Sequence, residues 1–194
     1  MGCQTRFPSH QSHAFALRTG ADLNRPPGRS GNPQAVYDYR DVIQHILESV
    51  GLIDNYGAIV SPFLHLQIHG MNDRSLDSSK SYDLDVEIGT RGKSTCSPAV
   101  HDWIVRKFEG WSRTVEGRKR IVTGANERFP GDRSKTHHRH GDGREYCGHG
   151  DNFHTVQIEF TRWLRSEHQP EIEHVLQCIA QEFENAEPER WNAT

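Results

Sequence analysis

The spacing of apolar residues predicts three amphipathic helices. Apolar side chains recur every three or four positions over residues 33–50, as they do along a helix with one buried face. Asn32 suits the N-cap of this helix, and Gly51 suits the position just after its end. The same spacing predicts a second helix that starts at Ser97 and a last helix that opens at Pro170.

Strict alternation of apolar and polar residues predicts three strands. In the stretch FLHLQIHG, residues 63–70, the leucines and the isoleucine share one face, and the histidines and the glutamine share the other. We interpret this stretch as a buried, central strand that ends at a loop with His69 at its mouth. Residues 84–89 and 155–162 show the same alternation.

The order of these elements predicts the fold class. Strands alternate with helices, which favours one three-layer α/β/α domain over residues 1–194 with a mixed, mostly parallel sheet. We expect residues 1–17 and 186–194 to be irregular. Residues 124–152 are polar and rich in glycine and histidine without any period, so we expect a long loop there, after a short strand over residues 120–123.

Composition narrows the class of protein. The net charge of −3 provides no basic surface of the kind that binds nucleic acid. No apolar run is long enough to span a membrane and no apolar leader is evident, so we expect a cytoplasmic protein without a membrane contact. The four cysteines lack a C-x-x-C pattern, which favours reduced thiols. The 13 histidines direct attention to metal or acid–base chemistry.

Three polar positions are candidates for chemistry. His69 ends a strand, where open α/β sheets usually carry their sites. Glu159 lies within an apolar strand, where a carboxylate is costly unless it is paired or functional. Arg25, fixed by the Pro-Pro turn of ADLNRPP, presents a planar fork suited to a carboxylate. Each also has a structural explanation: a satisfied strand-end histidine, a solvated glutamate on an edge strand, and a charged surface loop.

The histidine-rich tract over residues 137–154 has two interpretations. Such tracts can collect metal ions, but the HHRH spacing fits no closed zinc site. A mobile, solvated loop beside the substrate is the alternative, with His154 and Thr155 as its nearest contributors to a site.

Five short motifs occur in order between Arg18 and Leu164, namely ADLNRPP, FLHLQIHGM, DVEIGTRGKSTCSP, ANERFPGD and VQIEFTRWL. On these motifs the chain resembles the N-formylglutamate amidohydrolases, a family similar in fold to the zinc carboxypeptidases and aspartoacylases. The resemblance implies a zinc carboxypeptidase-like, phosphorylase/hydrolase-like fold. It also implies hydrolysis of a small-molecule substrate, the amide of an N-acylated acidic amino acid. Arg91, in the GTRGKS run, is then expected to bind substrate.

The resemblance also implies a role for each of the main candidates. His69 would be a zinc ligand, and Glu159 would be the general base and acid that activates the metal-bound water. Asn24 and Arg25 would hold the substrate carboxylate, and Arg18 would polarise the scissile carbonyl. Zinc would acidify its water, and zinc and arginine together would stabilise the developing oxyanion.

The chain departs from the family at its beginning. Relatives supply the other two zinc ligands from a loop well ahead of the Asn-Arg pair, whereas only 23 residues precede Asn24 here. We therefore expect the N-terminal part of the family to be missing, with His10 and His13 as the nearest substitutes in H-x-x-H spacing. Two alternatives stay open: a non-catalytic relative that binds an acidic ligand, and a histidine-rich metal-binding protein.

Overall fold

The computed structural model describes residues 23, 25–54, 56, 58–73, 84–115, 120–131, 134–143 and 146–191. Contacts divide the chain into two compact units, residues 1–41 and 42–194. The first includes the short 3-10 helix η1 (Pro27–Arg29), and the second contains the sheet. Helix α1 (Pro33–Ser49) begins in the first unit and ends in the second. The single domain expected over residues 1–194 stays a prediction.

Helix α1 has the two ends that the sequence predicts. The side chain of Asn32 accepts a hydrogen bond from the backbone N–H of Ala35 at 3.3 Å. Gly51 follows the helix with a φ of +69°, a left-handed conformation that glycine adopts without steric cost. The prediction of this helix is confirmed at both of its ends.

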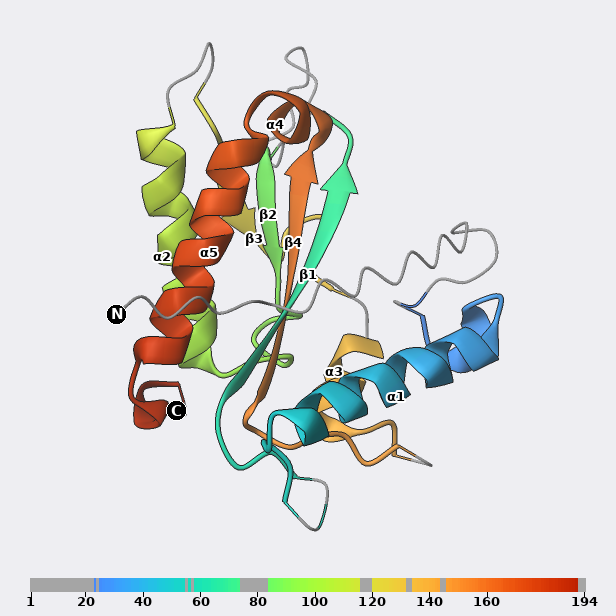
Figure 1. Ribbon diagram of the computed structural model, residues 1–194. Coiled ribbons are helices and arrows are strands. Elements are labelled where there is room, and N and C mark those ends of the chain that lie inside the picture. The colour runs from blue at the N-terminus through green and yellow to red at the C-terminus, as the bar shows by residue number, and fades with distance from the viewer. Residues whose placement is uncertain are drawn as a thin grey trace. The chain divides into compact units, whose positions relative to one another are not determined.

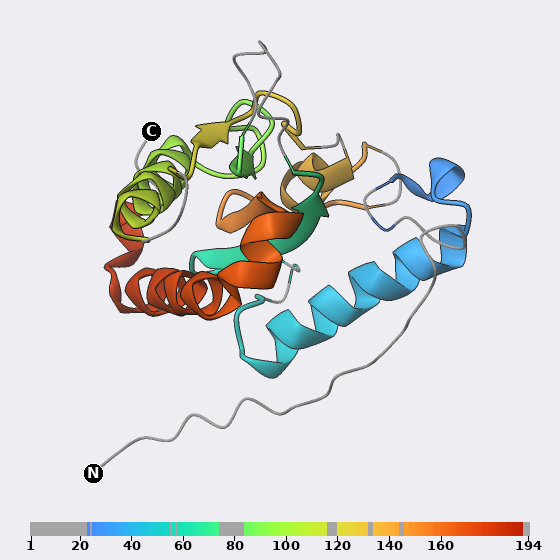
Figure 2. The same ribbon diagram turned by 90° about the horizontal axis from the view of Figure 1, so that it is seen from above.

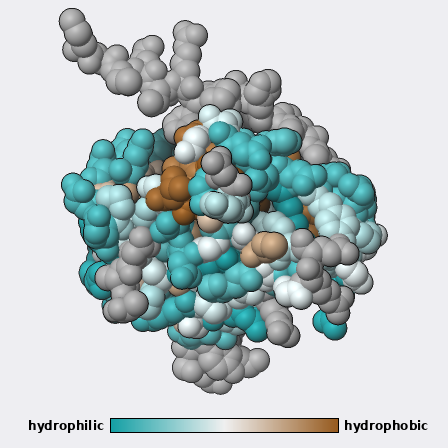
Figure 3. Space-filling model, turned by 90° about the horizontal axis from the view of Figure 1, so that it is seen from below, coloured by the Kyte–Doolittle hydropathy of each residue, from teal (hydrophilic) through white to brown (hydrophobic). Residues whose placement is uncertain are grey.

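Helix α1 carries apolar residues on two of its faces. Ile43 and Leu47 are buried, whereas Val42, Ile46 and Val50, spaced four residues apart, are exposed. Figure 3 shows a face of the molecule that is mostly hydrophilic, with hydrophobic residues confined to small areas. Some exposed apolar side chains are ordinary on a protein surface.

Four strands form one sheet in the order β1 (Phe63–Met71), β4 (Phe153–Thr161), β2 (Val86–Gly89), β3 (Thr123–Ala125). β1 pairs with β4 in parallel, and so does β2 with β3, whereas β2 and β4 run antiparallel (Figure 1). The predicted fold class, an α/β fold with a mixed and mostly parallel sheet, is therefore confirmed.

Strand β1 does not occupy the central position that the sequence predicts. It lies at the edge of the four described strands, and Ile68 on its apolar side is 47% exposed. Strand β4 is central instead, and its whole length is buried. This part of the prediction is wrong because alternation shows which side chains share a face and carries no information on strand order.

One face of the sheet packs against two long helices, α2 (Pro98–Thr114) and α5 (Gln169–Asn185), which lie side by side (Figure 1). Val156, Ile158 and Phe160 of β4 belong to the hydrophobic core on this helix-facing side. In Figure 2 both helices lie on the same side of the strands. Burial of these apolar side chains is the main stabilising contribution on this face.

Helices α2 and α5 begin where the sequence predicts. The hydroxyl of Ser97 accepts a hydrogen bond from the backbone N–H of Val100 at 3.2 Å and caps α2. Pro170 lies in the first turn of α5. Between β4 and α5 the chain forms a further short helix, α4 (Arg162–Glu167), which the apolar spacing does not signal.

The carboxyl-terminal segment contributes to the core. Residues 186–194, expected to be irregular, contain the 3-10 helix η2 (Pro188–Arg190). Trp191 follows it and is buried, with its ring stacked on Phe183 at a centroid distance of 4.8 Å. This aromatic pair fixes the described end of the chain against α5.

The described cysteines are free thiols, as the sequence predicts. Cys147 and Cys178 are exposed, whereas Cys96 lies in the hydrophobic core. Burial raises the pKa of the Cys96 thiol to about 12. Cys3 lies outside the described residues.

Helix α3 (Ser134–His140) lies against the opposite face of the sheet. The prediction of an uninterrupted loop over residues 124–152 is therefore wrong. The ring of His138 stacks on Phe153 at a centroid distance of 5.7 Å and meets His65 edge-on, also at 5.7 Å. These contacts with distant strands hold a helix whose own sequence has no apolar period, and α3 completes the third layer.

Candidate functional site

The face of the sheet opposite α2 and α5 carries three polar residues in line. Glu87 comes from β2, Glu159 from β4 and His69 from β1. The strand registers pair Glu159 with His69 on one side and with Glu87 on the other. Because paired residues project to the same face, the three side chains line up across three strands. We call Glu87, Glu159 and His69 the polar row.

Glu159 is buried in the middle of the sheet, with 6% of the residue exposed. Its Oε1 accepts a hydrogen bond from Nε2 of Gln157 at 2.5 Å. The structural explanation of Glu159 as a solvated residue on an edge strand is thereby excluded. A carboxylate at such a position costs free energy unless partners or a function compensate for its desolvation.

Glu87 is a member of the polar row that the sequence analysis did not select. It is fully buried, and its Oε1 accepts hydrogen bonds from the backbone N–H groups of Arg128 and Phe129, both at 2.6 Å. Its Oε2 is buried without a hydrogen-bond partner among the described residues. The signal that could have found it is the one that found Glu159, an acidic residue between apolar residues of a strand.

The close approach of a loop covers the polar face over β2. A Cβ atom added at Gly89 would lie 2.4 Å from the backbone oxygen of Phe129, so only glycine fits there. With Glu87 binding the N–H groups of the same loop, residues 126–131 are held against β2 from two sides. The loop therefore forms one wall beside the polar row.

Arg91 lies in a tight turn with three consecutive left-handed residues. The φ angles of Arg91, Gly92 and Lys93 are +49°, +63° and +71°. The side-chain oxygen of Asn126 fixes this turn by accepting hydrogen bonds from the N–H groups of Thr90 at 2.8 Å and Gly92 at 3.2 Å. Such a backbone is strained for non-glycine residues and persists because its surroundings hold it.

The register places Arg91 away from Glu159. Strand β2 runs antiparallel to β4, pairing Glu87 with Glu159 and Gly89 with Gln157. The turn after Gly89 therefore continues toward the amino end of β4, away from the polar row. The role of Arg91 in substrate binding stays a prediction.

The remaining predicted site residues lie elsewhere in the chain. Arg18 and Asn24 are outside the described residues. Arg25 is exposed and belongs to the first compact unit, whereas His69 and Glu159 belong to the second. Of the six predicted residues, the structure brings together His69 and Glu159, and the roles of all six stay predictions.

The described part of the histidine-rich tract is packed against the sheet and is not a solvated loop. His138 and His149 are buried. The hydroxyl of Tyr146 lies 3.0 Å from Nε2 of His149 and 3.4 Å from Nδ1 of His138. His149 also stacks on Phe153, with the ring centroids 5.2 Å apart. These histidines line the amino end of the polar face and stabilise α3 there.

His154, expected to contribute to a site, lies on the other side of the sheet. It is fully buried on the helix-facing side, where its Nδ1 accepts a hydrogen bond from the backbone N–H of Ser97 at 3.2 Å. Burial, together with the positive charge of Arg139, lowers the pKa of His154 to about 3. His154 is therefore a neutral core residue that a substrate cannot reach.

The described residues do not complete a metal site by themselves. Within residues 23–191 as far as they are described, no three His, Cys, Asp or Glu side chains lie together as a metal ion requires. His69 has the donor that zinc prefers and Glu159 beside it could orient a ligand, but a third donor from this part of the chain is lacking. The polar row therefore has side chains that can transfer protons, but the described residues do not supply a complete set of metal ligands.

Part of this chain is similar to a solved protein structure. No family model and no curated protein matches the chain. The crystal structure of N-formylglutamate amidohydrolase from Ralstonia eutropha JMP134 is similar, at 21% sequence identity and a TM-score of 0.47. The match covers 78% of this chain and 53% of the other, so the chain spans about half the length of that protein. The matched structure carries the name of the family that the sequence motifs resemble.

Among the described helices none is long and apolar enough to cross a membrane.

Proposed function

We propose that the chain is an amidohydrolase that cleaves the amide of a small N-acylated acidic amino acid. The observation that carries this proposal is the buried carboxylate of Glu159, paired in register with His69 on the polar face of the sheet. The order of the five sequence motifs supports the same reaction class. A buried acid beside an imidazole is an arrangement suited to moving protons in a water-poor site.

In the proposed reaction Glu159 handles both proton transfers. A water oxygen attacks the amide carbon while its proton passes to the Glu159 carboxylate. The C–N bond of the resulting tetrahedral species then breaks, and Glu159 returns the proton to the departing amine. The products are a small carboxylic acid and the free acidic amino acid, so atoms and charge balance.

Zinc is the metal that the sequence motifs imply, and His69 is the described residue that would hold it. When bound, zinc acidifies a water molecule and withdraws electrons from a carbonyl oxygen. The described residues lack a complete ligand set, and the proposed proton transfers require Glu159 alone. For substrate binding we retain Asn24, Arg25, Arg18 and Arg91 as the proposed set, because arginine forks bind carboxylates in two-point contacts.

A second candidate function is binding of an acidic ligand without turnover. It is favoured by the lack of three potential metal ligands in one place in the described part of the chain. The two candidates differ in one respect: the first needs a proton acceptor at position 159, and the second does not.

The experiment begins with the metal content of the purified protein and of His69→Ala. About one zinc per chain, lost in the variant, supports a site that uses His69. Hydrolysis of N-formyl-L-glutamate is then compared between the unchanged chain and Glu159→Gln, which keeps size and burial. Loss of a general acid–base group should lower the rate by about 100-fold or more.

A matched control uses Glu167→Gln, because Glu167 is exposed on α4. Its hydrolysis rate should equal that of the unchanged chain. If the unchanged chain and both glutamine variants bind the substrate without hydrolysing it, the first candidate is rejected in favour of the second. Equal rates in Glu159→Gln and the unchanged chain would remove Glu159 from the reaction.

A further inference from the structure

A surface pocket of about 470 Å³ lies between the last turns of α2 and the segment that enters β3. This volume falls in the range of about 300–1,000 Å³ that is usual for small-molecule sites. Its lining comes from two segments, residues Glu109, Ser112 and Arg113 on one side and Arg120, Ile121, Val122 and Thr123 on the other. We call this site the arginine pocket.

The arginine pocket is separate from the polar row. Thr123 pairs in register with Val86, a core residue on the helix-facing side, whereas Gly124 pairs with Glu87. The pocket therefore opens on the helix-facing side beside β3, whereas His69 lies on β1 at the other edge of the described sheet. A ligand bound here cannot contact the polar row.

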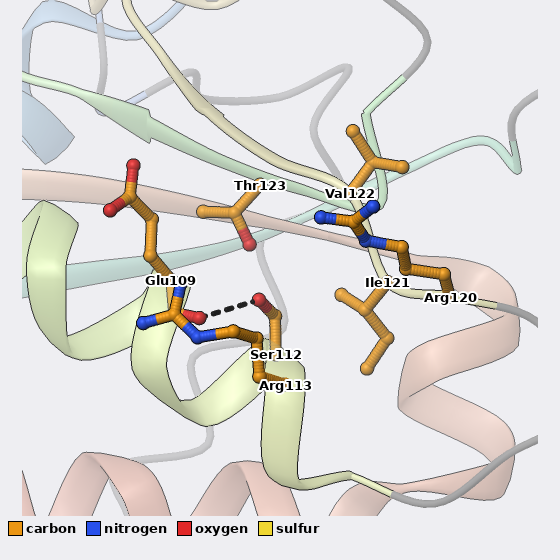
Figure 4. Close-up of a pocket in the computed structure, with 7 residues that line it drawn as sticks. All are labelled: Glu109, Ser112, Arg113, Arg120, Ile121, Val122 and Thr123. Carbon is orange, nitrogen blue, oxygen red and sulfur yellow. Dashed lines mark hydrogen bonds between the residues drawn. The ribbon is translucent and has the colours of Figure 1, made fainter.

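Two guanidinium groups line the pocket from different elements. In Figure 4 Arg113 and Arg120 lie on either side of the space, and the hydroxyl groups of Ser112 and Thr123 lie between them. The hydroxyl of Ser112 donates to the backbone oxygen of Glu109 at 2.9 Å, which leaves its lone pairs available. Thr123 Oγ1 is buried and has no hydrogen-bond partner within the described ranges. Two arginine forks suit two carboxylates of one small molecule, and the lone pairs of Ser112 suit an ammonium group of the same molecule.

The negative features of the pocket limit which anion fits. Glu109 contributes a carboxylate to the lining, and the segment 109–113 lies in the last turns of α2. The carboxyl end of a helix carries partial negative charge and favours a cation. Phosphate has no cationic group to meet these negative features, whereas an ammonium group would be attracted to them. The lining thus offers places for two carboxylates and one ammonium.

We propose that the arginine pocket binds a free acidic amino acid. Its two carboxylates contact Arg113 and Arg120, and its ammonium group faces Glu109 and the end of α2. This class is also the product that the proposed function would release, but binding at the pocket requires no turnover and stands on the pocket alone. Ile121 forms a rigid base, since it belongs to the hydrophobic core.

Calorimetric titration of the unchanged chain with L-glutamate tests the proposal, because L-glutamate carries no acyl amide that the chain could hydrolyse. Three probes are compared: L-glutamate, 2-oxoglutarate, which lacks the ammonium group, and inorganic phosphate. Saturable binding is expected for L-glutamate, and weaker binding for the other two. Loss of a charged hydrogen bond in Arg113→Gln or Arg120→Gln should weaken L-glutamate binding by about tenfold or more.

The controls separate this pocket from the other proposed site. Arg106→Gln removes an exposed arginine of α2 that does not line the pocket, so L-glutamate affinity should stay unchanged. Arg25→Gln would weaken binding only if L-glutamate bound at the substrate site of the proposed function. Glu109→Gln should weaken L-glutamate binding and strengthen 2-oxoglutarate binding.

Three results would overturn the proposal. These are no saturable binding of L-glutamate, equal affinity for phosphate and L-glutamate, or an affinity that Arg25→Gln lowers and Arg113→Gln does not. The last result would leave the proposed function intact. Conversely, an inactive protein that still binds L-glutamate through Arg113 and Arg120 would support the pocket and reject the amidohydrolase.

Discussion

Strand β4 contributes buried side chains to both faces of the sheet, apolar side chains to one face and polar side chains to the other. Toward α2 and α5 it presents Val156, Ile158 and Phe160, which stabilise the fold by leaving water. Toward the other side it presents Gln157 and Glu159, whose burial costs free energy. Folding alone accounts for the first face, whereas the second is retained at a cost that a function would explain.

The largest expected effect is on the apolar face. Phe160→Ala should lower the free energy of unfolding by about 3–5 kcal/mol, because it leaves a cavity where Phe160 meets Phe108 and Trp111. Glu159→Gln, one position earlier, should cost less than about 1.5 kcal/mol, since glutamine keeps an acceptor for Gln157. Urea unfolding of both variants measures the contrast. Equal losses would show that the polar face stabilises the fold as much as the apolar face does.

The next effect concerns the loop that covers the polar face. Glu87→Ala should cost about 2–3 kcal/mol, because the N–H groups of Arg128 and Phe129 lose their acceptor. Glu87→Gln keeps one acceptor oxygen and should cost less. Hydrogen exchange of these two amides, measured with urea unfolding, should be faster in the alanine variant than in the glutamine variant. Unchanged exchange in both would mean that Glu87 does not hold the loop.

A third effect depends on pH and arises on the apolar face, at its buried histidine. The pKa of His154 is about 3 in the folded protein against 6.5 for an ordinary histidine. Between these values the unfolded chain binds a proton that the folded chain excludes. Stability is therefore complete above about pH 6.5 and falls as the pH decreases, by up to about 1.4 kcal/mol per pH unit.

The measurement is urea unfolding at a series of pH values, with His154→Asn as the comparison. Asparagine keeps an acceptor for the N–H of Ser97 but does not titrate. The slope of stability against pH should therefore be smaller in the variant. His101 contributes a slope of the same sign, because burial and Lys93 lower its pKa too. An identical slope in both proteins would contradict the assignment to His154.

The smallest effect is expected at Gln67, on the polar side of β1. Its side-chain oxygen is buried without a hydrogen-bond partner in the described structure. Gln67→Leu removes this unsatisfied acceptor, so the free energy of unfolding should change by less than about 1 kcal/mol, in either direction. A larger loss, measured by urea unfolding, would show that Gln67 makes a stabilising contact and would weaken the contrast between the two faces.

Features with a local signal could be predicted from the sequence. Helices α1 and α2 follow from apolar spacing and from the caps at Asn32, Ser97 and Gly51. The faces of β4 follow from alternation. Glu159 stands out in the sequence because a carboxylate within an apolar strand is unusual, and its burial agrees with that reasoning.

Features that depend on distant residues could not be predicted. Glu87 is held by backbone groups 41 and 42 positions later, and no local pattern reports such a pairing. The edge position of β1 and the antiparallel direction of β2 depend on the order of strands. Helix α3 depends on the stacking of His138 on a ring of β4. The sequence identifies His69 and Glu159 as separate candidates, and the register between β1 and β4 shows that they are neighbours.

The reactivity of the Cys96 thiol reports how often the hydrophobic core opens. Thiol reagents attack the thiolate, and with a pKa of about 12 almost none is present at neutral pH. Modification of Cys96 must therefore wait until the core behind β4 opens, whereas the exposed Cys147 and Cys178 react at once. The slow phase of thiol modification, which belongs to Cys96, therefore measures the rate of core opening in the unaltered chain. No probe has to be introduced into either face of the sheet.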